Sequence, residues 1–118
     1  KVKEPFSPSL IAHTAGSAAM DDIKFLEKTL AINNDGYIFL QKELTSLGIE
    51  TIPSVANFLT SIWETNTQAL DITQSLLKKG VIVRNLKAFG WPNCIRISIG
   101  TADENGRFID AIKSILSN

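Results

Sequence analysis

The chain has 118 residues, of which 44% are hydrophobic and 20% are charged, and its 12 basic residues balance its 12 acidic ones. This composition is typical of one globular domain and excludes a disordered, collagen-like or coiled-coil chain. A net charge of zero gives no electrostatic case for binding nucleic acid or an anionic membrane, and no apolar run reaches the ~18 residues that span a bilayer.

The sequence lacks the residues that several kinds of functional site require. A single cysteine and a single histidine exclude an internal disulfide framework, a Cys-rich zinc site and a multi-His metal site. Neither a glycine-rich phosphate loop nor a nucleophile elbow is present. No signal peptide or lipidation motif is visible, so we expect a cytoplasmic location.

The first third of the chain predicts two helices. Ser7-Pro8 is a helix start signal, and the alanine-rich residues 9–20 favour a first helix. Asp21-Asp22 marks the start of a second helix, because acidic side chains are favourable at a helix N-terminus.

An apolar stripe runs along the second helix at steps of three and four residues. Its members are Leu26, Leu30, Tyr37, Leu40, Leu44 and Leu47. The Asn-Asn-Asp-Gly cluster at residues 33–36 is typical of a turn. Because the stripe keeps its phase across that cluster, we predict one continuous helix, which Gly48 ends.

Two strands and a third helix follow. Residues 49–52 predict a short strand that Pro53 stops, and residues 55–63 predict a longer one in which Asn57 lies between apolar neighbours on its own face. Thr65 and Gln68 have the spacing of a capping box, so a helix begins there, and Gly80 closes it.

The last part of the chain predicts two more strands and a helix. Residues 81–84 form the first strand and residues 94–99 the second. In the second strand Ile95, Ile97 and Ile99 share one face, whereas Cys94, Arg96 and Ser98 share the other. Cys94 has no evident base, which favours an inert packing thiol. A capping box at residues 101–104 opens the final helix.

The predicted order is α-α-β-β-α-β-β-α. We therefore expect an α/β (α+β) two-layer sandwich, with a small mixed or antiparallel sheet and helices on one face. The isoleucine face of residues 94–99 would meet the helices. The opposite face, which carries Arg96, would point toward solvent or a partner.

Two arginines are the candidate binding residues. Arg84 and Arg96 lie in neighbouring predicted strands, which would bring their guanidinium groups together, and arginine is suited to bidentate capture of carboxylate or phosphate. The alternative is that each arginine pairs with a local acid such as Glu50 or Glu64.

Three stretches of the sequence resemble the C-terminal part of the histidinol-phosphate aminotransferases. They are Ala56-Asn57-Phe58, Gly80-Val81-Ile82-Val83-Arg84, and Gly-Trp-Pro-Asn-Cys-Ile-Arg-Ile-Ser-Ile-Gly-Thr at residues 90–101 with Glu104-Asn105. The likeness covers essentially the whole chain, and the stretch around Arg96 is its most specific part. Asn85 departs from the family, which often has proline there.

The resemblance implies a fold-type I enzyme that uses pyridoxal phosphate to move an amino group between histidinol phosphate and 2-oxoglutarate in histidine biosynthesis. It places Arg96 where the substrate's phosphate or carboxylate binds, Arg84 at a second anion contact and Asn57 near the substrate. Threonine-phosphate decarboxylases and aromatic aminotransferases share much of this pattern and remain alternatives within the family.

The resemblance also implies that residues 1–118 are a small C-terminal domain cut from a larger, homodimeric enzyme. None of the chain's lysines has the serine- and glycine-rich setting of the family's Schiff-base lysine. We therefore expect no catalytic, cofactor-binding or metal-binding residue in this chain, and an inactive isolated domain. The expected partners are the enzyme's own large domain and a small anionic substrate. The competing hypothesis is a free-standing module that binds an anionic ligand or a protein.

Overall fold

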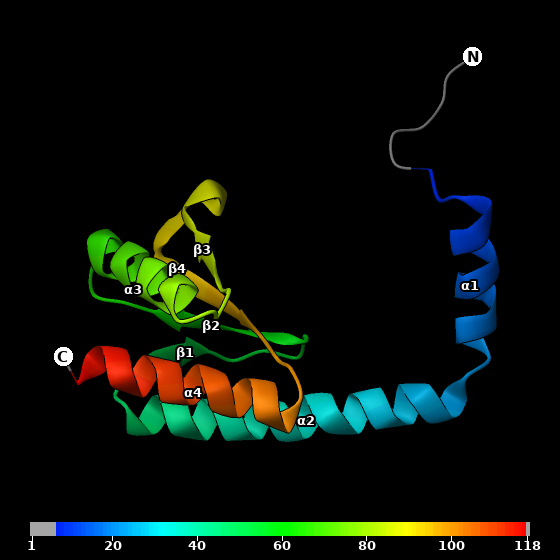
Figure 1. Ribbon diagram of the computed structural model, residues 1–118, viewed down its shortest axis with the longest axis horizontal. Helices are drawn as coiled ribbons and strands as arrows, with labels where there is room; N and C mark the ends of the chain where they lie inside the picture. The colour runs from blue at the N-terminus through cyan, green and yellow to red at the C-terminus, as the bar shows by residue number, and fades with distance from the viewer. Residues whose placement is uncertain (1–6, 118) are drawn as a thin grey trace, which may run out of the picture. The chain divides into compact units, whose positions relative to one another are not determined.

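The computed structural model describes residues 7–117. The chain divides into two compact units, Lys1–Ala31 and Ile32–Asn118. Within those residues no helix is both long and apolar enough to cross a membrane. The elements are α1 (Leu10–Met20), α2 (Ile23–Ser46), β1 (Glu50–Ile52), β2 (Phe58–Ile62), α3 (Asn66–Lys78), β3 (Arg84–Leu86), the 3-10 helix η1 (Lys87–Phe89), β4 (Trp91–Ser98) and α4 (Ala102–Leu116) (Figure 1). This succession confirms the predicted order of helices and strands.

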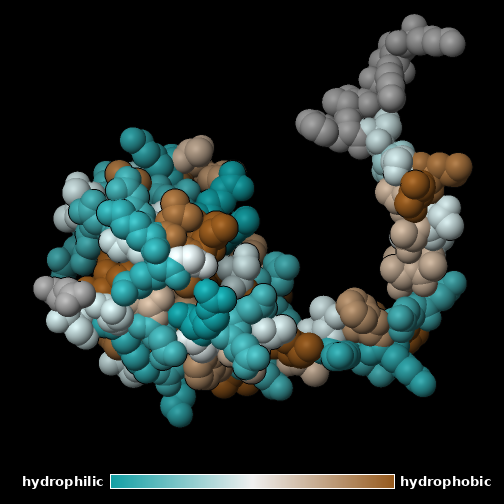
Figure 2. Space-filling view, in the orientation of Figure 1, coloured by the Kyte–Doolittle hydropathy of each residue, from teal (hydrophilic) through white to brown (hydrophobic). Residues whose placement is uncertain are grey.

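The first unit holds α1 and the beginning of α2. The cap of α1 is Ser9, whose hydroxyl accepts the Ala12 N–H at 3.2 Å, so the predicted start at Ser7 is two residues too early. Asp22 caps α2 as its acidic character predicts, because its carboxylate accepts the Phe25 N–H at 3.0 Å. No residue of α1 is buried, and Figure 2 shows apolar side chains on its surface.

The continuous second helix is confirmed, since α2 passes through the Asn-Asn-Asp-Gly cluster without a break. Gly36 has a packing role there rather than a turn role. A Cβ on Gly36 would lie 2.5 Å from the Ile99 side chain and 2.8 Å from the Asn105 amide, so only glycine lets α2 approach α4 this closely. Gly48 follows the helix with φ +73°, the left-handed conformation of a C-terminal cap.

The four strands form one antiparallel sheet in the order β1-β2-β4-β3. Leu59 pairs with Ile97 and Ser61 pairs with Ile95, so these four residues share one face. All four are buried.

Side chains from α2, α3 and α4 complete the core over that face. Its helical members are Leu40, Leu44, Ala69, Ile72, Leu76, Phe108, Ile109, Ala111 and Ile112. The predicted two-layer sandwich, with the isoleucine face of β4 against the helices, is therefore confirmed, and the sheet is antiparallel.

A short chain of buried hydrogen bonds crosses this apolar core. The Trp63 indole N–H donates to the Ser61 hydroxyl at 3.0 Å, and that hydroxyl donates to the Ile95 carbonyl at 3.3 Å. The hydroxyl thus satisfies the indole, which would otherwise lose a hydrogen bond on burial. These bonds join β2 to β4 through side-chain atoms as well as through the backbone ladder.

The strand predicted for residues 55–63 begins later, at Phe58. The Ser54 hydroxyl accepts the Ala56 N–H at 3.1 Å, which folds the chain into a bend after Pro53. Asn57 therefore lies in the bend and not in the strand.

The strand predicted for residues 81–84 is also displaced, because β3 begins only at Arg84. The Val81 N–H donates to the Leu76 carbonyl at 2.9 Å and prolongs the C-terminal cap of α3. Val81 and Val83 pack against the core, whereas Ile82 is 85% exposed. The side chains of residues 81–83 thus alternate as predicted, but the two valines are partly buried beside the sheet rather than within it.

Strand β4 is longer at its start than the predicted residues 94–99, since it begins at Trp91 and ends at Ser98. Pro92 is tolerated because the pairing with β3 is irregular at that end, where the register shifts between Asn85 and Leu86. The Asn85 side-chain amide donates to the Pro92 carbonyl at 3.1 Å and bridges the irregular section.

Capping is confirmed at both predicted boxes, but only one box is complete. The Thr65 hydroxyl accepts the Gln68 N–H at 3.1 Å, whereas the Gln68 side chain accepts the N–H of Glu64, one residue before the cap. At α4 both halves are present, because the Glu104 carboxylate also accepts the Thr101 N–H at 2.8 Å. These hydrogen bonds lower the pKa of Glu104.

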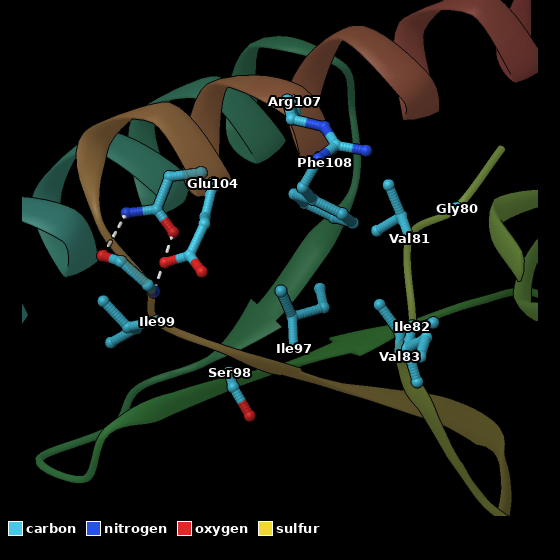
Figure 3. A pocket seen from close by; sticks show the side chains of 12 residues that line it. Gly80, Val81, Ile82, Val83, Ile97, Ser98, Ile99, Glu104, Arg107 and Phe108 are labelled. Carbon is cyan, nitrogen blue, oxygen red and sulfur yellow. Dashed lines mark hydrogen bonds between the residues drawn. The ribbon is translucent and has the colours of Figure 1, made fainter.

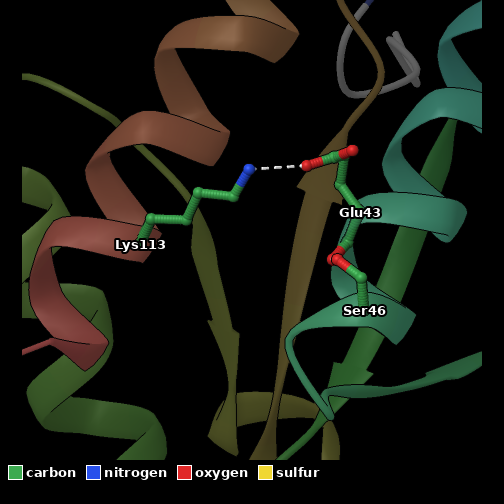
Figure 4. Close-up of polar contacts among 3 residues, drawn as sticks. All are labelled: Glu43, Ser46 and Lys113. Carbon is green, nitrogen blue, oxygen red and sulfur yellow. Dashed lines mark hydrogen bonds and ion pairs between the residues drawn. The ribbon is translucent and has the colours of Figure 1, made fainter.

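An exposed ion pair links α2 to α4. The Lys113 ammonium lies 2.7 Å from the Glu43 carboxylate, and the Ser46 hydroxyl donates to the Glu43 carbonyl (Figure 4). The hydrogen bond from Lys113 is the main cause of the lowered pKa of Glu43. Because solvent screens such a pair, it adds little to the burial of the two helices.

The glycine at the α2–α4 contact gives a test of this packing. We expect Gly36→Ala to lower the free energy of unfolding, although alanine favours helices by ~1 kcal/mol, because the added methyl group meets Ile99 and Asn105. Gly106→Ala in α4 is the matched control: nothing lies within 4 Å of its added Cβ, so it should be neutral or stabilising. Urea unfolding measures both variants, and equal stabilisation by both would contradict the close approach.

The capping box of α4 should make stability depend on acid pH. Since the folded-state pKa of Glu104 lies below its ordinary value of 4.5, its contribution is present above pH 4.5 and is lost as pH falls through the folded-state pKa. We expect Glu104→Gln to weaken this loss, as urea unfolding between pH 7 and pH 3 will measure. Asp103→Asn removes a charge from the same helical turn but leaves the capping bonds in place. The same change in acid dependence in both variants would assign the effect to the helix dipole instead.

Candidate anion-binding site

The face of the sheet opposite the helices carries the two predicted arginines side by side. Arg96 in the middle of β4 pairs with Arg84 at the start of β3, and on its other side it pairs with Thr60 of β2. Because paired residues of neighbouring strands point to the same face, these three side chains form a row across the sheet. The two arginines are therefore paired residues on one face of the sheet, but the predicted approach of their guanidinium groups is a separate matter.

Each guanidinium group lies over its own aromatic ring. The Arg96 guanidinium carbon lies 5.2 Å from the centroid of Phe58, and that of Arg84 lies 5.0 Å from the centroid of Phe89. Phe58 lies in β2, opposite Ser98 at the end of β4, whereas Phe89 lies in η1, between β3 and the start of β4. The two cations are neighbours in the backbone, but separate rings hold their charged ends.

No acid neutralises these cations within residues 7–117. The ion pair formed in that part of the chain joins Lys113 to Glu43, on the helical layer. The alternative that Glu50 or Glu64 pairs with the arginines is therefore wrong for the described residues. Arg96 is half-buried and Arg84 is exposed, so both positive charges face the open side of the sheet.

Asn57 is exposed and directly precedes the Phe58 ring that stacks on Arg96. Its carbonyl accepts the Ile99 N–H at 2.9 Å, which continues the pairing of β2 with β4 by one step. None of the contacts of the described residues joins Asn57 to either arginine.

Cys94 shares the face of Arg96 but is only 5% exposed. Burial raises the pKa of its thiol, and the thiol donates to the Asn93 side-chain oxygen at 3.7 Å. A buried thiol of raised pKa has little thiolate at neutral pH, which fits a packing role rather than a nucleophilic one.

A pocket of about 470 Å³ lies on the helical side of the sheet, between residues 80–83, the end of β4 and the first half of α4 (Figure 3). Figure 3 shows Ile97 pointing into it, whereas Ser98 points away toward the open face. Arg107 and Glu104 stand at the α4 side of the pocket. The pocket is thus separated from the arginine pair by the sheet itself.

A family model, described as "Aminotransferase class I and II", matches residues 1–112. The chain belongs to this aminotransferase family. It is 43% identical over 116 residues to a histidinol-phosphate aminotransferase of Nitratidesulfovibrio vulgaris, and 40% identical over 121 residues to histidinol-phosphate aminotransferase 1 of Psychrobacter arcticus. These alignments cover 98% and 100% of the chain but 31% and 32% of the relatives, so the chain spans about a third of their length.

A solved structure of the same fold supports the architecture. The crystal structure of the histidinol-phosphate aminotransferase from Clostridium acetobutylicum superposes with a TM-score of 0.84 over 98% of this chain and 36% of that one. At 22% identity this similarity shows the fold alone.

Aminotransferases of this family depend on pyridoxal phosphate, and the described lysines do not suit its covalent anchor. Such a lysine must be desolvated or tuned by nearby charge to react near neutral pH. Lysines 24, 28, 42, 78, 79, 87 and 113 are all exposed. Residues 7–117 also hold no cluster of acidic, histidine and cysteine side chains that suits a metal ion. What this aminotransferase chain offers is an open sheet face that carries two arginines without an acid partner among the described residues.

Sequence reasoning missed Phe58 and Phe89 as members of the site. Phe58 could be placed on the outer face of its strand, but its partner across the sheet depends on the register between β2 and β4, which no local pattern shows. Phe89 lies in a short 3-10 helix between the last two strands, so its position beneath Arg84 has no periodic signal in the sequence.

The buried thiol gives a test of how the strand presents its outer face. We expect iodoacetamide to alkylate Cys94 roughly tenfold or more slowly in the folded chain than in urea, because reaction needs local opening and a thiolate. The double variant Cys94→Ser/Ser98→Cys moves the thiol to an exposed position of the same strand and should react quickly when folded. Equal protection of the two thiols would show that Cys94 is not selectively buried.

Proposed function

We propose that residues 1–118 form the C-terminal small domain of a pyridoxal phosphate-dependent histidinol-phosphate aminotransferase. In this proposal the complete enzyme moves an amino group between histidinol phosphate and 2-oxoglutarate, as part of histidine biosynthesis. The names and the identities of the relatives support this substrate class. The same proposal includes a cytoplasmic homodimer and a large domain of the same polypeptide that holds the cofactor.

The observation that carries the proposal is the arginine pair on the open face. Two cations on paired residues of one face, without an acid partner among the described residues, make that face positive and favour the binding of an anion. Guanidinium groups match the geometry of phosphate and carboxylate oxygens through paired N–H donors.

Both proposed substrates carry an anionic group that such a site can bind. Histidinol phosphate carries a phosphate, and 2-oxoglutarate carries a second carboxylate. We assign Arg96 as the main contact to either anion, since it is half-buried and therefore better shielded from water. Arg84 is the second contact, and Asn57, in the bend before β2, is a third substrate contact. When bound in the complete enzyme, pyridoxal phosphate supplies the amino-transfer chemistry, and the residues of this chain bind and orient the substrate.

The test removes the Arg96 charge in the complete polypeptide that contains this chain. We expect Arg96→Gln to lower kcat/KM for histidinol phosphate by roughly tenfold to a hundredfold, because hydrogen bonds to a charged group are lost, and to affect the uncharged analogue histidinol little. Steady-state kinetics with both amino donors measures the difference.

The matched control is Arg107→Gln, which removes an exposed arginine from the helical side of the sheet. It should leave the discrimination between the two donors unchanged. If Arg96→Gln lowers both rates equally, or if Arg107→Gln has the same selective effect, Arg96 is not the phosphate contact.

A further inference from the structure

The ring beneath Arg96 lies diagonally across the sheet from it. Arg96 pairs directly with Thr60, whereas Phe58 pairs with Ser98, two residues further along β4. The distance of 5.2 Å between guanidinium carbon and ring centroid therefore requires the arginine side chain to lean from β4 toward β2. This direction takes the charge away from Arg84, which leans toward Phe89 in η1, near the start of β4.

An aromatic ring holds a cation in a different way from an acid. The ring attracts the guanidinium through its negative face but carries no net charge, so the positive charge is not neutralised. Stacking also occupies a flat face of the guanidinium and leaves its N–H groups, which lie in the plane, available to an incoming anion. A carboxylate at the same place would bind those N–H groups itself and compete with the substrate.

We propose that Phe58 is the positioning residue for Arg96: it holds the guanidinium over the open sheet face, away from Arg84, with its charge and N–H groups ready for the substrate's anionic group. This inference rests on the proposed function, in which Arg96 binds that group. In this inference Phe58 acts through Arg96, whose guanidinium lies over its ring, and favours the bound geometry before the substrate arrives.

The first test measures kinetics in the complete polypeptide with histidinol phosphate and with histidinol. A cation–π contact of this kind corresponds to roughly threefold to twentyfold in affinity. We expect Phe58→Leu to raise KM for histidinol phosphate by that factor, with little change in kcat or in the histidinol reaction. Phe58→Tyr keeps the ring and should retain the parental KM.

Two comparisons separate positioning from a merely structural role. In an Arg96→Gln background Phe58→Leu should have no further selective effect, because the group that it positions is absent. Ile62→Val shortens a half-buried side chain on the same face of β2, four residues after Phe58. It should leave the discrimination between the donors unchanged. The inference is overturned if Phe58→Leu slows both donors equally, or if its selective effect persists without Arg96.

A second measurement does not depend on the substrate. Phenylglyoxal modifies free guanidinium groups, and mass spectrometry can follow the modification of Arg96 in the complete polypeptide without any ligand. We expect Phe58→Leu to speed this modification severalfold and Phe58→Tyr to leave it unchanged. If Arg96→Gln does not discriminate between the donors, the proposed function fails. The modification rate of Arg96 still tests the positioning role, which is overturned if Phe58→Leu leaves that rate unchanged.

Discussion

The burial of Ile95 and Ile97 against the helices determines where the polar residues of β4 point. Because side chains alternate along a strand, the two isoleucines cannot reach the core unless Arg96 faces the opposite side. The antiparallel pairing then places Arg84 in the same outward row. The charged surface of this domain is thus a direct consequence of its apolar packing. The free energy gained by burying the core offsets the cost of placing two arginines opposite each other in the sheet.

The rings of Phe58 and Phe89 resolve a conflict that this packing creates. A binding face for anions must keep its positive charge, yet two arginines opposite one another in a sheet are unfavourable. An acid partner would relieve the repulsion at the expense of the binding capacity. Each ring instead stabilises one cation by its quadrupole and directs it away from the other. Phe89 is exposed and Phe58 is half-buried, so both rings leave apolar surface in water, and this role gives a physical reason for them to be there.

The sequence predicted the element order and the faces of β4 because these follow from local periodicity and capping. It misplaced the starts of β2 and β3, since competing local bonds decide them: the Ser54 hydroxyl bends the chain before β2, and the cap of α3 extends to Val81. In the α2 stripe Leu40 and Leu44 are buried as expected and Tyr37 and Leu47 are partly buried, whereas Leu26 and Leu30 are exposed within the first unit. The arginine pair was predictable from strand alternation. The stacking rings were not, because their positions depend on register and on a 3-10 turn, which no short window of sequence encodes.

The Ser61 hydroxyl carries a consequence for the whole outer face. Bonded at once to the Trp63 indole and to the Ile95 carbonyl, it fixes which residues of the two central strands lie opposite each other. A slip of one residue would turn Arg96 into the hydrocarbon interior, and a slip of two would carry it about 7 Å along the strand, out of reach of the Phe58 ring. A single hydroxyl oxygen in the apolar core therefore helps to set the strand register that positions charged side chains on the opposite face of the sheet.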